Sequence, residues 1–488
     1  MNAQNLVLQV LNDLKLQGIA VTTLASDSRA VQAGDVFLAY PGELSDGRDY
    51  IDAALQRGAI AVVYEANGAN IQELGVPHLA IGDLRALAAP LAAEVYGHPS
   101  EALWLIGVTG TNGKTSVTQW LAESFKLAGK SCAVVGTLGN GFPGALEPSP
   151  NTTPNALVLQ QSLNRFVAAG AEVCAMEVSS IGIEEGRVDA SRFAAAVFTN
   201  FTRDHLDYHG SMEAYAEAKA RLFDWPGLEV AIINLDDPFG LQLLAHINGR
   251  IRCIGYTLNN IQAPVDECLS ARNLSMSTSG VEFELNGLRV HANVVGRFNV
   301  SNLLAVMATM RANGIALGEA ISACSKLQPP PGRMQTLGGE GAPLVVVDYA
   351  HTPDALDKVL GTLREVAAAR AGKLHCVFGC GGDRDAGKRP LMGAVAERQS
   401  DHVVLTSDNP RSEDPAAILG AIRAGMKTLP HIEMDRGVAI RTVIAAAAKQ
   451  DVVLLAGKGH EDYQEIKGER FPFSDLLHAK QALEARPC

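Results

Sequence analysis

The sequence predicts an α/β protein of three domains: a small N-terminal α/β domain, a central domain with a P-loop on a parallel sheet, and a C-terminal domain with a Rossmann-like sheet. Its 488 residues exceed the usual size of one domain, about 100–200 residues. Short apolar strands alternate with helices along most of the chain, which is typical of parallel sheets covered by helices on both faces. We place the domains at residues 1–100, 101–335 and 336–488.

A glycine-rich loop at residues 106–116 is the strongest functional signal. It reads Ile-Gly-Val-Thr-Gly-Thr-Asn-Gly-Lys-Thr-Ser and lies between an apolar strand (102–108) and a helix (about 116–128). This order predicts a P-loop whose backbone N–H groups bind phosphate oxygens. Val108 stands where G-x-x-x-x-G-K-[ST] requires glycine, so we interpret the loop as a variant. The alternative is a glycine-rich turn with a solvent-exposed lysine.

Seven consecutive residues of this loop are candidates for binding ATP. Two glycines let the backbone approach the phosphates, the lysine reaches the terminal phosphates, and the threonine after it can ligate Mg²⁺. The set is Gly110, Thr111, Asn112, Gly113, Lys114, Thr115 and Ser116.

The N-terminal region predicts strands over 36–39 and 60–64 and helices over 51–57 and 84–96. Two polar turns, at 27–29 and 41–48, are either surface loops or segments that bind a ligand through hydroxyl and backbone groups. The sequence alone leaves both alternatives open.

Two central strands end in polar side chains that are candidates for metal binding. The strand over 173–176 ends in Glu177, where a Mg²⁺ ligand is expected beside a P-loop; the alternative is a helix N-cap. The strand over 194–199 leads into a polar segment that contains His205. Polar residues at the carboxyl end of a strand favour a functional histidine over a packing residue.

Lys219 lies on the apolar face of a helix predicted over 212–224, in register with Met212, Tyr215 and Leu222. A lysine on such a face normally extends its ammonium group to solvent. The alternative is a buried lysine with a lowered pKa that is modified or catalytic.

Asn299 and Asn302 stand beside the start of a helix predicted over 301–313, where paired amides can bind both edges of a purine. The segment 329–333 reads Pro-Pro-Pro-Gly-Arg and predicts a hinge before the last domain. Four strands are then predicted, over 345–347, 375–378, 403–406 and 452–455. Each ends in a polar loop, and in an open α/β sheet such loops converge on one site. No G-x-G-x-x-G supports dinucleotide binding there.

Composition narrows the classes of function. A net charge of −12 argues against broad nucleic-acid binding, which needs a basic surface. The eight cysteines are scattered and predict buried free thiols in a reducing compartment. Cys376 and Cys380 lack the second cysteine or histidine pair of a zinc site. We find neither a basic leader nor an apolar run of about 20 residues, so no membrane insertion and a cytoplasmic location are expected.

Several motifs together resemble the Mur ligase family, in the right order over most of the chain. They are Gly110-Thr-Asn-Gly-Lys-Thr115, Glu177-Val-Ser-Ser180, Thr199-Asn200 with Asp204-His205, Gly296-x-Phe-Asn299-x-x-Asn302, Gly332-Arg333 and Asp348-Tyr-Ala-His351. Further motifs are similar to the members that add the third peptide residue: Asp27-Ser-Arg29, Asn151-Thr-Thr153, Gly382-Asp-Arg384, Asp408-Asn-Pro-Arg411 and Gly457-Lys-Gly-His-Glu461.

The resemblance implies an ATP-dependent, ADP-forming amide ligation in peptidoglycan precursor synthesis, with Mg²⁺. The D-glutamate γ-carboxylate of a UDP-muramoyl dipeptide would form an acyl phosphate, which the amine of meso-diaminopimelate would displace. The Asp-Asn-Pro-Arg form is similar to the diaminopimelate-adding members. Alternatives are a lysine-adding ligase, more distantly a folylpolyglutamate synthetase, and a P-loop ATPase or regulatory module without ligation. Small-molecule substrates and a monomer are expected.

The resemblance also assigns roles to residues. Lys114, Glu177, His205 and Lys219 would be catalytic; Thr115 and Glu177 would hold one Mg²⁺, and His205 with carbamylated Lys219 the second. Adenine would lie near Asn299 and Asn302, and Arg333 near the ribose and phosphates. The UDP substrate would contact Ser26, Ser28, Asn151, Thr152, Thr153, Ser179, Glu185, Arg187 and a uracil loop at 43–45. Diaminopimelate would contact Arg384, Asp408, Asn409, Pro410, Arg411, Gly457 and Glu461.

Two residues depart from the family pattern. Ile181 stands where many relatives have histidine, which removes a polar group near the γ-phosphate. Glu185 stands where glutamine is expected and brings a negative charge beside an anionic substrate.

Overall fold

A computed structural model of the chain describes residues 3–42, 45–71, 73–247, 249–277 and 280–486. Two residues of the expected uracil loop, Glu43 and Leu44, and the last cysteine, Cys488, lie outside the described residues. The chain forms two compact units. The first comprises Met1–Thr109, Phe125–Ala196 and Ala218–Ala231, and the second comprises Gly110–Ser124, Val197–Glu217 and Ile232–Cys488.

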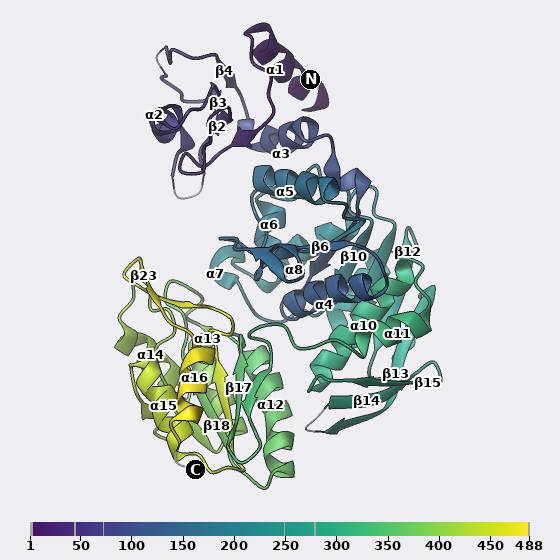
Figure 1. The fold of residues 1–488 in the computed structure, drawn as a ribbon, viewed down its shortest axis with the longest axis vertical. Coiled ribbons are helices and arrows are strands. Elements are labelled where there is room, and N and C mark those ends of the chain that lie inside the picture. Colours follow the sequence, from purple (N-terminus) through teal and green to yellow (C-terminus); the bar gives the residue numbers. More distant parts are fainter. Residues whose placement is uncertain (1–2, 43–44, 72, 248, 278–279, 487–488) are drawn as a thin grey trace. The chain divides into compact units, whose positions relative to one another are not determined.

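The first unit begins with a parallel four-stranded sheet in the order β1-β2-β3-β4 (Figure 1). Alternate residues of β2 face opposite sides: Val36 and Leu38 pack with α1 and α3, whereas Phe37 and Ala39 pack with α2. The predicted strands and helices of this region are confirmed to within one residue at each end. The elements are α1 (Ala3–Leu16), β1 (Leu24–Ala25), β2 (Val36–Ala39), α2 (Ile51–Gln56), β3 (Ala61–Glu65), β4 (His78–Ile81) and α3 (Leu84–Val95).

The remaining strands of the first unit follow the order β10-β5-β9-β6-β7-β8. Strands β5, β9 and β6 are parallel and almost entirely buried, as expected for a sheet covered on both faces. Strands β7 and β8 add an antiparallel hairpin. The elements are β5 (Trp104–Thr109), β6 (Cys132–Gly136), β7 (Gly139–Phe142), β8 (Ala145–Glu147), α5 (Ala156–Ala168), β9 (Val173–Glu177), α6 (Ser180–Glu184) and β10 (Ala195–Phe198).

In the second unit the order is β15-β14-β13-β12-β11-β10. Strands β13, β14 and β15 are antiparallel and extend the predicted parallel sheet at this edge, an extension that was not predicted from the sequence. Asn286 and Gly287 join β14 to β15 with φ of +51° and +80°, the signs of a type I′ hairpin turn. The elements are α4 (Lys114–Leu127), α7 (Leu206–His209), α8 (Met212–Ala220), β11 (Val230–Asn234), α9 (Pro238–Ile247), β12 (Arg252–Thr257), β13 (Glu267–Ser277), β14 (Gly280–Leu285), β15 (Leu288–Ala292), α10 (Arg297–Ala312) and α11 (Leu317–Cys324). Part of α4, α8 and β11 belongs to the first unit.

The C-terminal part of the second unit contains a six-stranded sheet in the order β16-β17-β21-β18-β19-β20. Helices α12, α13 and α14 cover one face, and α15 and α16 cover the other (Figure 1). The four predicted strands are the parallel centre; the edge strands β16 and β20 are short and mostly exposed, so hydrophobicity did not reveal them. The elements are β16 (Gln335–Gly338), β17 (Leu344–Asp348), α12 (Pro353–Ala369), β18 (Leu374–Phe378), α13 (Lys388–Gln399), β19 (His402–Leu405), α14 (Pro415–Arg423), β20 (His431–Ile432), α15 (Arg436–Ala446), β21 (Val452–Ala456), β22 (Tyr463–Ile466), β23 (Glu469–Pro472) and α16 (Asp475–Glu484).

Three helix boundaries differ from the sequence prediction. Helix α8 ends at Ala220 and a 3₁₀ turn continues to Asp224, so the segment 212–224 is not one α-helix. Helix α10 begins at Arg297, directly after Gly296 with φ +99°, four residues before the predicted start. Helix α4 begins at Lys114, directly after Gly113. In both helices a glycine with a positive φ ends the loop and sets the first helical residue.

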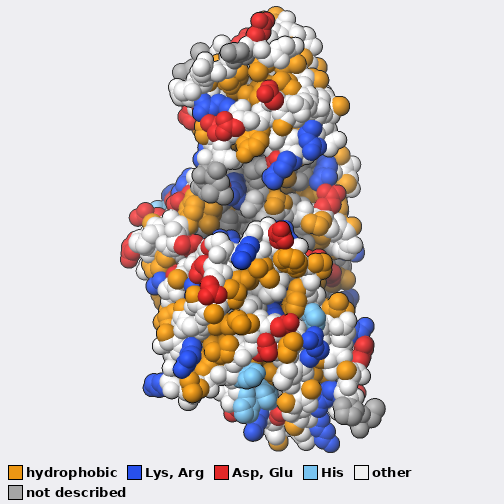
Figure 2. All heavy atoms as spheres, turned by 90° about the vertical axis from the view of Figure 1, so that its left-hand side faces the viewer, with side chains coloured by type: hydrophobic (Ala, Val, Ile, Leu, Met, Phe, Trp, Pro, Cys, Tyr) orange, Lys and Arg blue, Asp and Glu red, His pale blue; other side chains and the backbone are white. Residues whose placement is uncertain are grey.

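Seven cysteines among the described residues are free thiols, and all but Cys268 are buried, as predicted. Burial raises the pKa of Cys324 and Cys380 to about 12. Among the described residues, every helix is too short or too polar to cross a membrane. On the face in Figure 2, basic side chains are scattered among acidic and uncharged ones.

Candidate active site

The phosphate loop is supported by the segment after β10. Thr111 N donates to Asn200 O at 2.8 Å, and Asn112 N donates to Asn200 Oδ1 at 2.9 Å. Thr199 Oγ1 and Asn200 Nδ2 both donate to Asn112 O, at 2.6 and 3.0 Å. These four hydrogen bonds fix the loop backbone from outside, so neighbouring protein groups set its conformation.

Both loop glycines are required by backbone conformation and by close neighbours. Gly110 has φ +143° and Gly113 has φ +87°, and a Cβ at Gly113 would lie 2.6 Å from Asn302 Oδ1. Asn302 Nδ2 donates to Asn299 Oδ1 at 3.4 Å, and Asn299 Nδ2 donates to Val295 O at 2.9 Å. The structure thus brings the two amides predicted for adenine to the phosphate loop.

The two charged groups expected at the phosphates contact the loop itself. Lys114 Nζ donates to the carbonyl oxygens of Gly110 and Thr111, at 2.8 and 2.9 Å. Arg333 Nη2 donates to Thr115 Oγ1 at 2.9 Å. Arg333 was predicted from the resemblance to lie near ATP, and the structure places it on the loop residue expected to ligate Mg²⁺.

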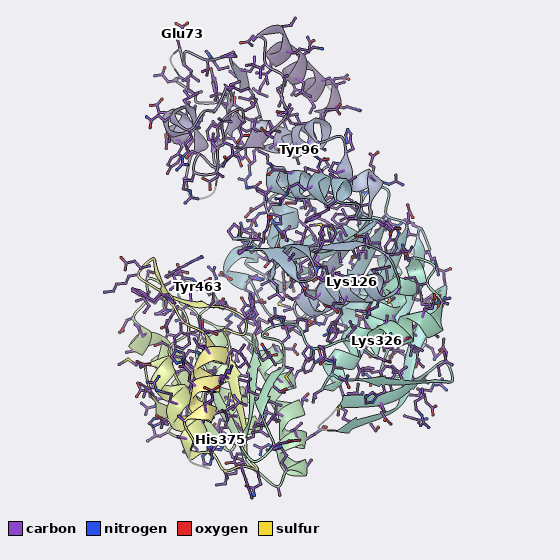
Figure 3. The ribbon with its side chains drawn as sticks, viewed as in Figure 1. Glu73, Tyr96, Lys126, Lys326, His375 and Tyr463 are labelled. Carbon is purple, nitrogen blue, oxygen red and sulfur yellow. The ribbon has the colours of Figure 1, made fainter. Side chains whose placement is uncertain are left out.

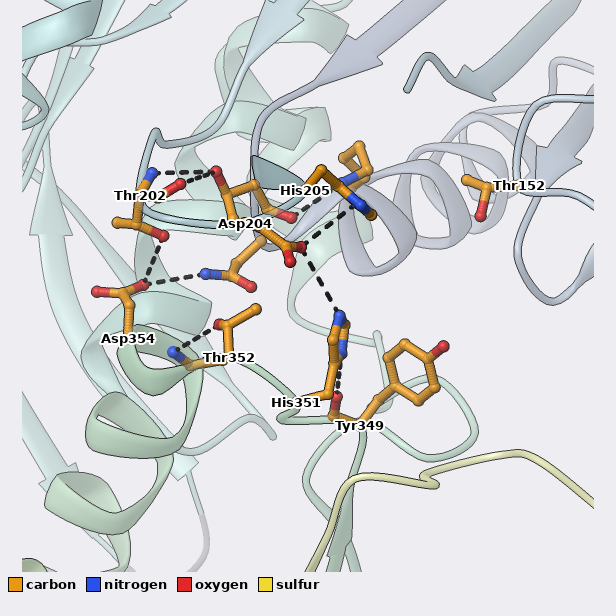
Figure 4. Close-up of polar contacts among 12 residues, drawn as sticks. Thr152, Thr202, Asp204, His205, Tyr349, His351, Thr352 and Asp354 are labelled. Atoms are coloured by element: carbon orange, nitrogen blue, oxygen red, sulfur yellow. Dashed lines mark hydrogen bonds and ion pairs between the residues drawn. The ribbon is translucent and has the colours of Figure 1, made fainter. Parts of the chain in front are cut away.

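Asp204 lies between two histidines (Figure 4). Its Oδ2 is 3.4 Å from His205 Nε2 and 3.9 Å from His351 Nε2. Burial alone would raise the pKa of Asp204, but His205, His351 and Lys388 outweigh burial and lower it to about 2. Burial first and Lys388 second lower the pKa of His351 to about 4. Asp204 is therefore a fixed anion, and His351 a neutral imidazole near pH 7.

Asp354 connects the phosphate loop to the start of α12 (Figure 4). Its Oδ2 accepts a hydrogen bond from Asn112 Nδ2 at 3.0 Å, and lies 2.9 Å from Lys358 Nζ. Thr202 Oγ1 donates to the same oxygen at 3.5 Å. Thr352 caps α12 by accepting a hydrogen bond from Ala355 N. Asp354 is a further candidate residue that positions the phosphate loop through Asn112.

Two loops that follow C-terminal strands meet at Gly381, and a third joins them through Asn409. A Cβ at this glycine would lie 2.9 Å from Arg411 Nη1 and 3.9 Å from both Arg384 Cγ and Asn409 O. Asn409 Nδ2 donates to Glu461 Oε2 at 2.8 Å. Three of the four loops predicted to converge, those after β18, β19 and β21, therefore lie together, and they bring two arginines, an amide and a carboxylate to one place.

The other three residues predicted to contact diaminopimelate, Asp408, Pro410 and Gly457, determine the backbone conformation of these loops. Gly457 has φ +111°, which strains a residue with a side chain, and a Cβ there would also come too close to Asp408 Oδ2. Asp408 Oδ1 accepts a hydrogen bond from Asn409 N at 2.7 Å. Pro410 O accepts a hydrogen bond from Glu413 N at 3.0 Å.

Lys458 is a fully buried lysine at this site, and sequence reasoning did not single it out. Its ammonium donates to Asn409 Oδ1 and to Glu461 Oε2, both at 2.9 Å. Its position between two glycines could have suggested a loop lysine, but only packing shows that it is buried. The lysine fixes the orientation of the Asn409 amide, because an ammonium group can only donate.

The first unit contains a cluster of hydroxyl groups around Glu177. Thr137 N and Oγ1 donate to the two carboxylate oxygens of Glu177, at 2.8 and 3.2 Å. Thr137 Oγ1 is 3.0 Å from Thr152 Oγ1, and Thr153 Oγ1 donates to Glu177 O at 2.9 Å. Ser179 caps α6 by accepting from Gly182 N, so the alternative that Glu177 is the cap is wrong. Thr137 follows β6 and was missed because one threonine after a strand is a weak signal.

Arg187 joins this cluster and balances Glu185. Its Nη1 donates to Thr153 O at 2.8 Å, and its Nε donates to Glu185 Oε2 at 2.6 Å. The charge that Glu185 brings is thus paired inside the protein. Among the described residues, no hydrogen bond or ion pair joins Ser26, Ser28 or Asn151 to Arg187 and the hydroxyl cluster.

The four predicted metal ligands are divided between the units. Glu177 and Lys219 belong to the first unit, and Thr115 and His205 to the second. Lys219 is 1% exposed, so the expectation that it extends to solvent is wrong. The hard oxygen donors of Thr115 and Glu177 suit Mg²⁺, and a buried lysine suits conversion to an anionic carbamate.

Family models match three consecutive parts of the chain. The Mur ligase family catalytic domain matches residues 20–96, the Mur ligase middle domain matches 108–310, and the Mur ligase glutamate ligase domain matches 332–459.

Curated relatives match over nearly the full length. A protein of Pseudomonas aeruginosa is 52% identical over 96% of this chain and 96% of its own, and one of Janthinobacterium is 51% identical over 95% and 94%. Both are named UDP-N-acetylmuramoyl-L-alanyl-D-glutamate--2,6-diaminopimelate ligase.

A solved structure with the same name is 39% identical, with a TM-score of 0.64 over 95% of both chains. MurF ligase from Thermotoga maritima has a TM-score of 0.68 at 20% identity, over 95% of this chain and 96% of its own, which shows a common fold. The α/β fold class is confirmed, and the chain belongs to the Mur ligase family.

Proposed function

We propose that the protein joins 2,6-diaminopimelate to UDP-N-acetylmuramoyl-L-alanyl-D-glutamate, using ATP and releasing ADP and phosphate. Relatives about half identical over nearly the whole chain carry this name, which supports the assignment. The division into three domains at about residues 100 and 335, the monomeric state and the cytoplasmic location remain predictions.

One structural observation carries the proposal: a single short segment contacts both the phosphate loop and an amino-acid loop. Arg333 donates to Thr115 and its guanidinium lies 4.5 Å from the ring centroid of Tyr349. The adjacent Gly332 is packed so closely on Gly459 and the backbone of His460 that a side chain would not fit. A simple ATPase needs no second group of polar loops coupled to its P-loop in this way.

In the first chemical step, a γ-carboxylate oxygen of the substrate attacks the γ-phosphorus of ATP, and the bond to ADP breaks. Carboxylates acylate amines slowly until a good leaving group is attached, so the resulting acyl phosphate is reactive. Lys114 must leave the carbonyl groups of its own loop to neutralise charge on the transferring phosphoryl group. The backbone N–H groups at the start of α4 bind the remaining phosphate oxygens.

The residues assigned to metal binding fit Mg²⁺ by their chemistry. We assign one ion to the hydroxyl of Thr115 and the carboxylate of Glu177, and a second to His205 and a carbamylated Lys219. Bound Mg²⁺ would supply neutralisation of the phosphate charge. Thr137 orients the Glu177 carboxylate by two hydrogen bonds, as supporting residues commonly do for metal ligands.

In the second step, the amine nitrogen attacks the acyl carbon. The new C–N bond forms, the C–O bond to phosphate breaks, and the amine loses a proton. Arg411, Arg384 and Asn409 orient the distal carboxylate of diaminopimelate, and Glu461 orients its distal ammonium. Lysine lacks that carboxylate and would offer no anion to these guanidinium groups, which favours diaminopimelate.

The UDP substrate is assigned to the first unit. We propose that Thr152, Thr153, Ser179 and Arg187 meet its muramoyl dipeptide, with Ser26, Ser28, Asn151 and the loop at 43–45 nearer the nucleotide. Because Arg187 is already paired with Glu185, the substrate anion would share that cation with a protein carboxylate.

The test measures ADP formation by the purified protein with ATP, Mg²⁺ and the UDP-muramoyl dipeptide. Separate reactions contain diaminopimelate, lysine or no amine, and mass spectrometry identifies the product. We expect turnover and a tripeptide product with diaminopimelate only. Preference for lysine would refute the specificity argument, and ATP turnover that needs no amine would indicate an ATPase.

A further inference from the structure

The hairpin β22–β23 holds the loop that carries Asn409 and Arg411. Arg411 N donates to Glu465 O at 3.0 Å, and Lys467 N donates to Arg411 O at 2.7 Å. Glu465 N donates to Asn409 Oδ1 at 3.0 Å, and Gln464 Nε2 donates to the backbone carbonyl of the residue before Asn409 at 2.7 Å. Tyr463, where the hairpin begins, lies at the opposite end of the C-terminal part of the second unit from His375, near the start of β18 (Figure 3). The hairpin therefore lies at the end that carries the predicted amino-acid site.

Arg411 adopts a left-handed backbone conformation, with φ +50°. Such a conformation is unfavourable for a residue with a side chain, so it needs support from its surroundings. The two backbone hydrogen bonds with the hairpin supply this support. The backbone of Arg411 is thus fixed without any contribution from the Glu465 side chain.

Two different contacts act on the Arg411 guanidinium. Nη1 donates to Gly382 O at 2.7 Å, a short hydrogen bond that orients the group. Nε lies 3.4 Å from Glu465 Oε2, a distance of an ion pair rather than of a strong hydrogen bond. The two side chains are 20% and 24% exposed, which leaves the guanidinium accessible to a ligand. Gly382 orients Arg411, and Glu465 mainly contributes negative charge.

We propose that Glu465 is a specificity-determining residue that acts through Arg411: its carboxylate partly neutralises the guanidinium until the distal carboxylate of the incoming amino acid takes its place. This inference rests on the proposed function, because it concerns the same amino-acid site. The arrangement has a counterpart at the other substrate charge, where Lys458 already pairs with Glu461. Arg411 and Glu461 thus each have an internal partner of opposite sign, and the zwitterionic end of the amino acid must compete with these protein groups.

The internal carboxylate sets how strongly the site selects a second carboxylate on its substrate. With Glu465 present, diaminopimelate only replaces one carboxylate partner of Arg411 by another. Its binding free energy therefore gains only the difference between these two ion pairs. Without it, the guanidinium would be unpaired when lysine binds and paired when diaminopimelate binds. Removal of the charge therefore widens discrimination between the two amino acids.

The decisive variant is Glu465→Gln, which keeps the side-chain shape and every backbone hydrogen bond of the hairpin. We expect the KM for diaminopimelate to fall about two- to fivefold, the range for a partly exposed ion pair. The kcat and the KM for ATP should stay unchanged. The KM for lysine, used as a poor substrate or measured as an inhibition constant, should not fall.

Glu469→Gln is the matched control. Glu469 is on the same hairpin, carries the same charge and is exposed, and within the described part of the chain its side chain forms no hydrogen bond or ion pair. The Glu469→Gln variant should leave kcat and the KM values for diaminopimelate, lysine and ATP unchanged. An unchanged KM for diaminopimelate in Glu465→Gln would overturn the inference. A rise for both amino acids would instead mean that Glu465 binds their ammonium group. Absence of ligation by the unmodified protein would refute the proposed function itself.

Discussion

A buried ion pair between Arg436 and Asp475 should control both the stability of the C-terminal sheet and its affinity for the amino acid. Both side chains are 0% exposed, and Arg436 Nε and Nη2 each donate to a carboxylate oxygen at 2.7 Å. Arg436 Nη2 also donates to Ala456 O at 2.9 Å, and Nη1 lies 3.5 Å from Ser407 O. These carbonyl groups directly precede Gly457 and Asp408, so the pair supports two loops of the predicted site.

The expected magnitudes follow from burial. Asp475→Asn removes one partner and leaves a buried guanidinium without its counter-ion, which costs about 3–5 kcal/mol of unfolding free energy. Arg436→Met leaves a buried carboxylate and should cost a similar amount. The double variant Arg436→Met/Asp475→Leu replaces the pair by apolar groups and should recover most of that loss. It cannot restore hydrogen bonds to Ala456 O and Ser407 O, so the KM for the amino acid should stay raised.

The assay combines hydrogen exchange with kinetics. Mass spectrometry of peptides from α15 and α16 measures their opening free energy in the unmodified protein, both single variants and the double variant. Initial rates give the KM for diaminopimelate and for ATP. Single variants that lose less than about 1 kcal/mol, or a double variant less stable than either single one, would refute the reasoning. A double variant with normal amino-acid affinity would show that the Arg436–Asp475 pair does not support the amino-acid site.

Two further predictions concern the loop after β21, and one concerns the phosphate loop. Lys458→Met should raise the KM for diaminopimelate about tenfold, with the KM for ATP unchanged. Unlike the Glu465 side chain, Lys458 also orients the Asn409 amide, and losing that orientation outweighs the release of Glu461 from its internal partner. Equal changes in both constants would contradict this. Asp354→Ala should raise the KM for ATP several-fold by releasing Asn112, and an unchanged value would exclude a supporting role. Burial and then Arg333 lower the pKa of His460 to about 4. The unfolded chain therefore takes up a proton below about pH 6.5 that the folded protein resists, and stability falls from pH 6.5 towards 4 by on the order of 2 kcal/mol. His460→Gln should flatten that part of the profile of melting temperature against pH; an identical profile would show that other groups cause it.

The sequence predicted those elements whose signals are local and strong. Continuous apolar runs gave β9, β18 and β21 to within one residue, because strands buried on both faces need apolar side chains at every position. The edge strands β16 and β20 were missed, since half or all of their residues are exposed. The β14–β15 hairpin was also missed, although its Asn286-Gly287 turn is a known signal for antiparallel strands.

In the candidate site too, the sequence shows which residue types are present, whereas their contacts appear only in the fold. Residue type and position after a strand made Lys114 and Glu177 candidates, and the family resemblance added Arg411, but neither revealed the groups that hold them. Lys458 illustrates why: a lysine between two glycines is usually exposed, and only the fold shows that its ammonium is buried between Asn409 and Glu461. Burial of a charge depends on contacts between distant segments, which one sequence does not reveal.

The partners found in the structure also change what the predicted residues can do. Glu185 was expected to repel an anionic substrate, yet Arg187 pairs with it at 2.6 Å. Arg411, expected to bind a carboxylate, already faces Glu465, and Glu461, expected to bind an ammonium, already accepts from Lys458. In each case a substrate charge must exchange with a protein charge of the same sign, so affinity depends on the difference between two ion pairs. Selectivity between amino acids should therefore respond to Glu465 and Lys458 as well as to the residues that touch the substrate.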